Sequence, residues 1–190
     1  MPLPNKSFYF IRHGETDWNK RHIIMGSIDI PLNDLGITES QQAASILKKE
    51  KFDAIISSPR IRALKTAQLI AEQVKINKPI IIINTQITER EWGDAEGKPI
   101  DPTKDLFNDE DTPHGAETFS AFTVRVLGAV SLILLEHNCP LIVSHGGVFK
   151  ALADSLGHKN LQALNCSPIL FKPAKNFWSV HNLVNESLDF

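Results

Sequence analysis

Two stretches of the sequence place a histidine where a run typical of a buried strand stops. An apolar, aromatic-rich run over residues 8–11 leads into Arg12 and His13, and a second apolar run over 140–144 leads into His145. A neutral imidazole, with an ordinary pKa of about 6.5, has a free lone pair near neutral pH, which makes His13 a candidate nucleophile. The fixed positive charge of Arg12 beside it indicates chemistry on an anionic group. A salt-bridged surface turn is the alternative interpretation of such a short motif.

Two more residues with suitable chemistry follow other expected strands. Arg62 lies in the first turns of a helix after the expected strand 52–57, and Glu89 lies in the loop after the expected strand 79–84. The carboxyl ends of parallel strands meet at one edge of a sheet, where ligands bind. We therefore expect both side chains to converge with the arginine and the two histidines named above. Taken singly, Arg62 is equally well a solvated helix arginine, and Glu89 one of several loop acids.

The chemistry that suits this combination is phosphoryl transfer without a metal or a cofactor. A transferring phosphoryl group spreads negative charge over three equatorial oxygens, which guanidinium forks match. We expect His13 to attack phosphorus and form a phosphohistidine, which splits hydrolysis into two easier steps. Glu89 would protonate the leaving alcohol and then activate water. His145, in protonated form, would clamp the equatorial oxygens.

Capping and composition signals predict the elements that must position these residues. Thr38 with Gln41 is the pattern of a capping box, and Ser58 before a proline is a helix start. Four consecutive isoleucines from 80 to 83 predict a parallel strand buried on both faces. The expected helices span 38–49, 58–74, 117–137 and 148–156, the last one capped by Gly157. The expected strands span 8–11, 52–57, 79–84, 140–144, 169–172 and 177–182.

This alternation of strands and helices predicts an α/β fold, in the form of a three-layer α/β/α sandwich with a mostly parallel sheet. Residues 85–113 show little periodicity, and a loop of that length usually has a function. The default interpretation of the acidic middle of this loop is a solvated segment. Nothing marks an internal repeat or a linker, so residues 1–190 are expected to form a single domain.

Composition excludes several classes of function. The 190-residue chain has a formal net charge of −2, which gives no global attraction to nucleic acid or to an anionic membrane. Cys139 and Cys166 lie far apart, without metal-type spacing, and fit a reduced, cytoplasmic compartment. No signal peptide is recognisable at the N-terminus. No apolar run reaches membrane-spanning length, and residues 124–135 are interpreted as a buried helix.

Four separated segments together resemble the signature of the histidine phosphatase superfamily, the phosphoglycerate mutase-like clan. The segments are Arg12-His13-Gly14-Glu15, which resembles the phosphohistidine motif, 57–63 with Thr66-Ala67, which resembles the segment of the second phosphate arginine, 89–97, which resembles the proton-donor motif, and Ser144-His145-Gly146-Gly147, which resembles the second-histidine motif. The segments 25–32 and 113–117 are also similar, although the latter has Ala-Glu-Thr where Glu-Ser is common in the family.

The resemblance implies an antiparallel edge strand, helices on both faces of the sheet and no metal. It implies a catalytic set of Arg12, His13, Arg62, Glu89 and His145. The phosphate- and substrate-binding set that we expect is Arg12, Asn19, Met25, Gly26, Arg62, His145 and Gly146. Within it, Asn19 would donate a hydrogen bond, and the Met25-Gly26 turn would offer exposed backbone. The backbone N–H groups of Gly146 and Gly147, at a helix start, would add dipolar support.

The shared catalytic residues leave three functions open. Cofactor-dependent mutases of this clan carry a long basic insertion before the second histidine, whereas here Glu89 and His145 are 145 − 89 = 56 positions apart, with Lys98, Lys104 and Arg125 among the few cations between them. This spacing favours hydrolysis of a small phosphorylated substrate, as in alpha-ribazole phosphatases or broad-specificity phosphatases. A phosphoglycerate mutase and a catalytically silent phospho-binding protein are the alternatives. The physiological substrate and the oligomeric state stay open, with a homodimer as one option.

Overall fold

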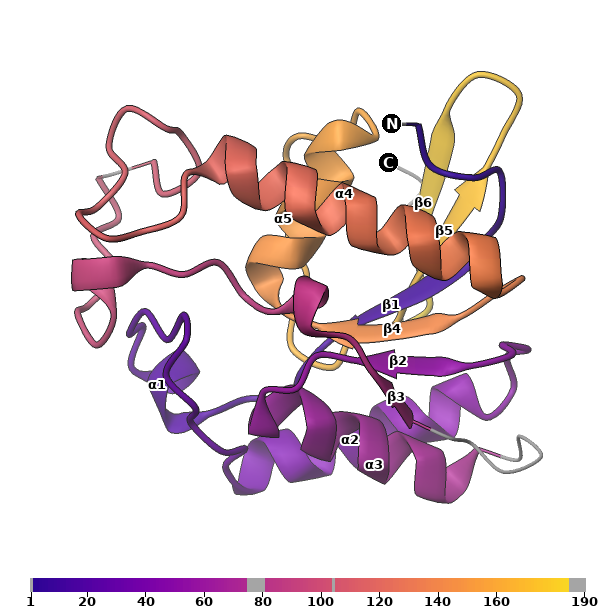
Figure 1. The fold of residues 1–190 in the computed structure, drawn as a ribbon. Coiled ribbons are helices and arrows are strands. Elements are labelled where there is room, and N and C mark those ends of the chain that lie inside the picture. The colour runs from indigo at the N-terminus through magenta and orange to yellow at the C-terminus, as the bar shows by residue number, and fades with distance from the viewer. Residues whose placement is uncertain (1, 75–80, 104, 185–190) are drawn as a thin grey trace.

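A computed structural model describes residues 2–74, 81–103 and 105–184. Its centre is a mixed sheet of six strands in the order β3-β2-β4-β1-β5-β6 (Figure 1). The strands are β1 (Phe8–Arg12), β2 (Ile55–Ser57), β3 (Ile81–Ile83), β4 (Leu141–Ser144), β5 (Ile169–Pro173) and β6 (Trp178–Asn182). β1, β2, β3 and β4 run parallel. The expectation of a mostly parallel sheet in an α/β fold is therefore confirmed.

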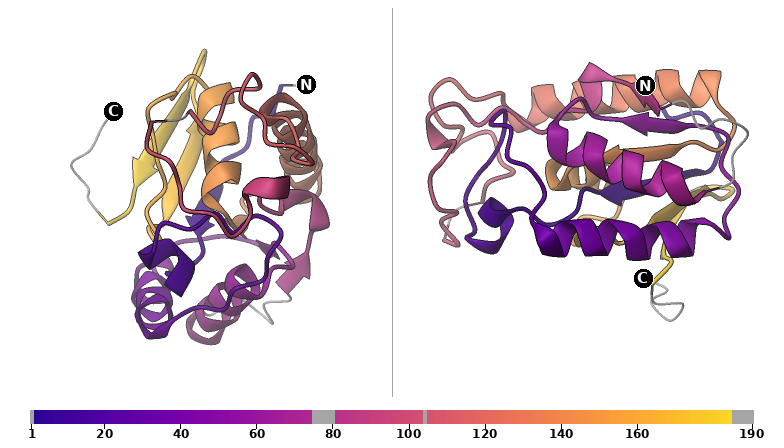
Figure 2. Two further views of the ribbon diagram at one scale, coloured as in Figure 1. Left: turned by 90° about the vertical axis from the view of Figure 1, so that its left-hand side faces the viewer. Right: turned by 90° about the horizontal axis from the view of Figure 1, so that it is seen from below.

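Helices cover both faces of the sheet, as Figures 1 and 2 show. The longer helices are α2 (Asp34–Leu47) and α3 (Ile61–Gln73) on one face, and α4 (Phe119–Glu136) and α5 (Gly146–Ser155) on the other. Phe8 and Phe10 of β1 pack into the core under α4 and α5, whereas Tyr9 and Ile11 pack into the core under α2 and α3. Because successive side chains point to opposite faces, a central strand with a core on each side is apolar throughout.

The pairing register aligns the strand ends that carry chemistry. Arg12 pairs with Ser144, so His13 and His145 leave the sheet side by side at its carboxyl edge. The helix α1 (Asp17–Lys20) and the loop after residue 90 lie at this same end of the sheet (Figure 1). The antiparallel strand is β5, which pairs with β1 and carries β6 on its other side, so it lies one strand in from the edge.

The predicted start of α2 was wrong. The N-cap is Asn33, whose side chain accepts the N–H of Gly36, and the helix begins at Asp34. Thr38 lies inside the first turns, where its hydroxyl donates to the carbonyl of Asp34. The capping box lies instead at Thr16, which exchanges hydrogen bonds with Asn19 and starts α1, a helix the sequence analysis missed. Asn33 and Thr38 are both residue types that cap helices, so the local sequence pattern alone did not decide which of them is the N-cap of α2.

The predicted start of α3 at residue 58 was also wrong, because the helix begins at Ile61. Arg60 is the N-cap of α3, without a side-chain cap, and the hydroxyl of Ser58 accepts the N–H of Arg60. Ser58 also contacts His145, so its hydroxyl serves the site as well as the helix start.

The isoleucine strand is not buried on both faces. β3 is the outermost strand beside β2, and Ile82 and Ile83 are 39% and 46% exposed. The sequence predicted the strand and its parallel direction correctly, but a composition rule cannot tell an edge strand from a central one. The start of the predicted strand, residues 79–80, lies outside the described residues, whereas the preceding helix α3 ends at Gln73, one residue before the predicted end at 74.

The apolar helix α4 is only partly buried. By length and composition alone it is sufficient to cross a membrane, contrary to the sequence-based expectation. In the fold it is a core helix, since Phe122, Val126 and Val130 are fully buried against the sheet. Its opposite side is exposed, which corrects the expectation of a buried helix; the exposed apolar side chains are Val124, Leu132 and Leu135.

Candidate active site

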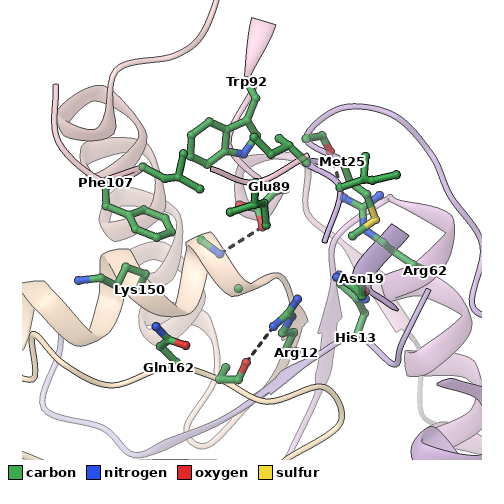
Figure 3. Close-up of a pocket in the computed structure, with 18 of the residues that line it drawn as sticks. Arg12, His13, Asn19, Met25, Arg62, Glu89, Trp92, Phe107, Lys150 and Gln162 are labelled. Atoms are coloured by element: carbon green, nitrogen blue, oxygen red, sulfur yellow. Dashed lines mark hydrogen bonds between the residues drawn. The ribbon is translucent and has the colours of Figure 1, made fainter. Parts of the chain in front are cut away.

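A cavity of about 540 Å³ lies at the carboxyl edge of the sheet (Figure 3). Arg12 and His13 reach it from the end of β1, Arg62 from α3, and Glu89 from the loop after the short 3₁₀ helix η1 (Thr85–Ile87). Four of the five predicted catalytic residues therefore line one cavity. The fifth, His145, is fully buried beside it, with its ring centroid 5.3 Å from that of His13. We call Arg12, His13, Arg62 and His145 the cationic cup.

The imidazole of His13 is fixed with one nitrogen available. Its Nδ1 lies 2.8 Å from the carbonyl oxygen of Gly14, which can only accept, so Nδ1 carries the proton and Nε2 carries the lone pair. The loop is held in turn by Asn165, whose amide donates to the carbonyl of His13 at 2.7 Å. Thr66 accepts the N–H of Gly14 at 3.1 Å. Burial, and then the charges of Arg62 and Arg12, hold the pKa of His13 well below its usual value.

The two arginines keep donors in reserve. Arg62 is fully buried and donates to the carbonyls of Ile28 at 2.9 Å and Gly26 at 3.0 Å. Arg12 donates to the carbonyl of Ala163 at 3.1 Å. The Nε atoms of both arginines are buried without a hydrogen-bond partner in the described part of the chain. Burial lowers the pKa of Arg62 to about 10, so its guanidinium is still charged at neutral pH. A buried cation with an unsatisfied donor favours an anionic ligand.

His145 is buried next to the charged arginines and has one nitrogen without a partner in the described residues. Its Nε2 lies 2.8 Å from the hydroxyl of Ser58, and its Nδ1 is buried with no partner in the described residues. Burial and the neighbouring charge of Arg62 hold its pKa well below the usual value, so the ring is neutral in the ligand-free protein. The expected protonated His145 refers to the protein with a bound phosphoryl group, and for that state it stays a prediction.

Glu89 is oriented by two backbone donors. Its Oε1 accepts the N–H of Arg90 at 2.8 Å, and its Oε2 accepts the N–H of Gly147 at 3.1 Å. A Cβ on Gly147 would lie 2.2 Å from Oε1 of Glu89, so only glycine lets the carboxylate approach α5 this closely. The N–H of Gly147, which we expected to support a phosphate, is engaged by this carboxylate instead, while Gly146 lines the cavity as predicted.

The remaining predicted binding residues also line the cavity. Asn19 is one of the lining residues, and its Oδ1 is engaged by Thr16 in the capping box (Figure 3). Met25 and Gly26 are buried rather than exposed, which corrects the sequence-based expectation. The carbonyl of Gly26 is not exposed backbone for a ligand, because it accepts from Arg62.

The sequence analysis missed the outer wall of the cavity. Trp92, Leu106 and Phe107, which we call the apolar wall, come from the loop that was left without a predicted course. Phe107 and Trp92 meet edge to face, with ring centroids 6.2 Å apart. The sequence signal for such a wall is weak, because isolated aromatic residues in a loop are equally typical of minor packing contacts. The other lining residues that were missed are Ile23, Ile24, Ile100, Asp105, Lys150, Leu161, Gln162 and Ala163.

The geometry as a whole suits the binding of a phosphate group. Two arginines, of which Arg62 is fully buried, and an imidazole with a free lone pair face one cavity, and a carboxylate lies on its opposite side (Figure 3). Arginine forks recognise phosphate oxygens bidentately, and a water-poor site strengthens this interaction. Within the described residues, no three histidine, cysteine, aspartate or glutamate side chains gather as a metal site.

Comparison with known proteins agrees with this class. The family described as the histidine phosphatase superfamily (branch 1) matches residues 8–185. The chain therefore belongs to the histidine phosphatase superfamily and is an enzyme of its phosphatase class.

Individual relatives carry more than one name. A Bacillus subtilis protein described as uncharacterized phosphatase PhoE is 34% identical over 157 residues, which cover 80% of this chain and 79% of the relative. Phosphoglycerate mutase-like protein 4 of Arabidopsis thaliana is 32% identical over 179 residues, covering 85% and 77%. The crystal structure of the alpha-ribazole phosphatase from Shigella flexneri has a TM-score of 0.78 and 23% identity, covering 97% of this chain and 98% of that one, and shows the likeness of fold alone.

Proposed function

We propose that this phosphatase is a metal-independent phosphomonoesterase that acts on a small phosphorylated metabolite through a phosphohistidine on His13. The observation that carries the proposal is the fixed Nε2 lone pair of His13, which shares one cavity with two charged arginines and an oriented carboxylate. We further propose a cytoplasmic location and a small-molecule partner, with no nucleic acid or membrane, consistent with the net charge of −2.

In the first step, Nε2 of His13 attacks phosphorus and the bond from phosphorus to the alcohol oxygen breaks. Glu89 supplies the proton that the departing alcohol needs. In the second step, water attacks the phosphohistidine and gives its proton to Glu89, which releases inorganic phosphate and neutral His13. Both steps need the nucleophile to be neutral at the outset, which fits the lowered pKa of His13.

Charge complementarity explains how the cup handles the transition state. The Nε–H groups of Arg12 and Arg62, which have no partner in the described residues, would donate to the equatorial oxygens. A bound phosphate dianion would oppose the effects that lower the pKa of His145. We therefore propose that His145 takes up a proton when the substrate binds and donates through Nδ1, its unpartnered nitrogen.

The cavity favours hydrolysis over transfer back to a substrate. A bisphosphorylated glycerate needs a second cationic binding group away from the cup. Lys150 is the further cation among the lining residues, and its ammonium already pairs with Asp154 and with the carbonyl of Lys159 at 3.0 Å. Because relatives include phosphoglycerate mutase-like proteins, a mutase is the second candidate. Substrates related to alpha-ribazole phosphate agree with the shared fold and with the apolar wall.

The test is hydrolysis of p-nitrophenyl phosphate in EDTA, combined with trapping of the intermediate. We expect turnover to persist in EDTA, and a phosphoryl label on His13 that is stable in base and labile in acid. His13→Ala should abolish both signals, a loss of at least about 10³-fold in kcat. Full turnover in His13→Ala would disprove the nucleophile. Stimulated mutase activity with 2,3-bisphosphoglycerate would favour the second candidate, and phosphate binding without any turnover would indicate a silent binding protein.

A further inference from the structure

A third arginine is buried next to the cavity without lining it. Arg90 is fully buried, and its guanidinium donates in three directions. Nε donates to the carbonyl of Glu117 at 2.7 Å, Nη1 to the carbonyl of Leu106 at 2.6 Å, and Nη2 to the hydroxyl of Thr112 at 3.4 Å. Such a residue has a structural task, because a buried guanidinium is costly unless its donors are satisfied.

All three acceptors lie in the segment from Leu106 to Glu117, which contains no helix or strand. This segment supplies two of the three residues of the apolar wall, Leu106 and Phe107. A loop with few regular backbone hydrogen bonds needs side chains to fix its course. Arg90 provides that fixation at three points spread over the whole segment.

The same guanidinium also holds the third wall residue. The Cζ of Arg90 lies 4.4 Å from the ring centroid of Trp92, in cation–π geometry. It lies 6.0 Å from the ring centroid of Phe119, which in turn packs edge to face on Phe107, with centroids 5.4 Å apart. One side chain therefore supports both aromatic rings of the apolar wall.

Within the described residues, the side chain of Arg90 makes no hydrogen bond to a reacting group. The hydrogen bond that Arg90 makes to Glu89 comes from its backbone N–H, which any replacement except proline would keep. The acids that favour its charge are Asp109, Glu117 and Glu89. Of these, Glu117 already forms an ion pair with Arg125 at 2.8 Å, so Arg90 uses its carbonyl.

We propose that Arg90 is a positioning residue that fixes the apolar wall, and thereby determines that the site prefers phosphomonoesters with an apolar alcohol portion. This inference rests on the proposed function, since the wall is then the surface against which the leaving group packs. Lysine cannot replace Arg90, because a point charge with a flexible stem does not reproduce three donors in a planar fork.

The test uses two ligands that are not turned over, so that wall and cup are measured separately. Inorganic phosphate reports on the cationic cup, and 1-naphthylmethylphosphonate reports on the cup and wall together. Their dissociation constants are measured by calorimetry for the wild type, Arg90→Lys, Arg90→Met and the matched control Arg125→Met. We expect the wild type to bind the phosphonate about ten-fold more tightly than phosphate, since an aromatic group is buried.

Both Arg90 variants should lose most of this preference while their affinity for phosphate stays within about two-fold. Arg125→Met, which removes a guanidinium bonded to the carboxylate of Glu117 and to the carbonyl of Gln86, should keep the preference. The inference fails if a folded Arg90 variant keeps the preference for the phosphonate over phosphate, or if its affinity for both ligands falls equally. It also fails if the wild type shows no such preference.

If Arg90→Met does not fold, Arg90→Lys carries the test. Phe107→Ala, which leaves Arg90 in place, must also lose the preference, and its retention there would disprove the role of the wall. Because no ligand is hydrolysed, these outcomes are independent of whether the proposed phosphohistidine forms.

Discussion

Burial determines the charge of each group around His13. Arg12 and Arg62 stay charged because guanidinium groups begin from a very high pKa, whereas the two imidazoles of the cup lose their protons. Nδ1 of His13 is engaged by a carbonyl, so the chemically useful nitrogen is Nε2. The residue types and their places at strand ends were predictable from sequence. The neutral state of His145 was not, because it depends on how deeply the ring is buried.

The two buried histidines predict a pH dependence of stability. The pKa values of His13 and His145 are lowered in the folded protein, while unfolded histidine titrates at about 6.5. Below that pH the unfolded state binds protons that the folded state excludes, so stability falls as pH falls toward the folded pKa values. Each histidine contributes up to about 1.4 kcal/mol per pH unit to the slope of the free energy of unfolding against pH. The two together contribute up to about 2.7 kcal/mol per pH unit.

Urea unfolding at intervals between pH 7.5 and 5 measures this slope in the absence of phosphate. His13→Gln and His145→Gln should each remove about half of the contribution. If the double variant keeps the wild-type slope, carboxylates rather than the cup are responsible.

At the scale of elements, the position of a helix start decides how the loops of the site are attached. Asn33 caps α2 through Gly36 and also donates from its amide to Glu15 at 2.9 Å, so one side chain joins α2 to the loop after His13. Gly36 packs against that loop closely, since a Cβ on Gly14 would lie 2.4 Å from the Gly36 carbonyl oxygen. The helix start therefore stabilises the conformation that holds the nucleophile.

Two alanine variants distinguish the observed cap from the one predicted by sequence. Asn33→Ala should lower the free energy of unfolding by about 1 kcal/mol or more, because it leaves N-terminal N–H groups unpaired. Thr38→Ala should change it by less than about 0.5 kcal/mol, since that hydroxyl only donates to a carbonyl within the helix. Denaturant unfolding of both variants measures the difference. An equal or larger loss in Thr38→Ala would contradict the assignment of the cap.

The elements show which features a sequence can predict. The strand ends at Arg12 and Ser144 follow from short local runs, and parallel pairing then brings their polar neighbours together. The edge position of β3 follows from strand order, which no local pattern contains. The course of the apolar wall follows from Arg90, whose three acceptors lie 16 to 27 residues away. Interactions at that separation are decided by packing, not by periodicity.

For the molecule as a whole, a net negative charge coexists with a local positive site. The formal charge of −2 gives no general attraction to anions, so affinity for phosphate must come from the arginines that line the cavity, Arg12 and Arg62. The site as a whole draws on both helical layers, because Arg62 belongs to α3 and the backbone donor to Glu89, Gly147, belongs to the start of α5. A ligand in the cavity therefore contacts both layers around the sheet and should stabilise the fold globally.

Inorganic phosphate should raise the free energy of unfolding, because the cup exists only in the folded state. At 100 times the dissociation constant the gain is about 2.7 kcal/mol by mass action. Thermal or urea unfolding across a phosphate titration measures it. Arg62→Met should lose the gain, whereas Arg125→Met, whose guanidinium lies outside the cavity, should keep it. The salt dependence separates the cup from the surface, and it is measured with potassium phosphate in about 0.5 M KCl against a reference of equal ionic strength. Because Arg62 is fully buried, the gain in the free energy of unfolding should persist there. A gain that came from exposed lysines would be screened. The same gain in Arg62→Met as in the wild type would place the phosphate outside the cup.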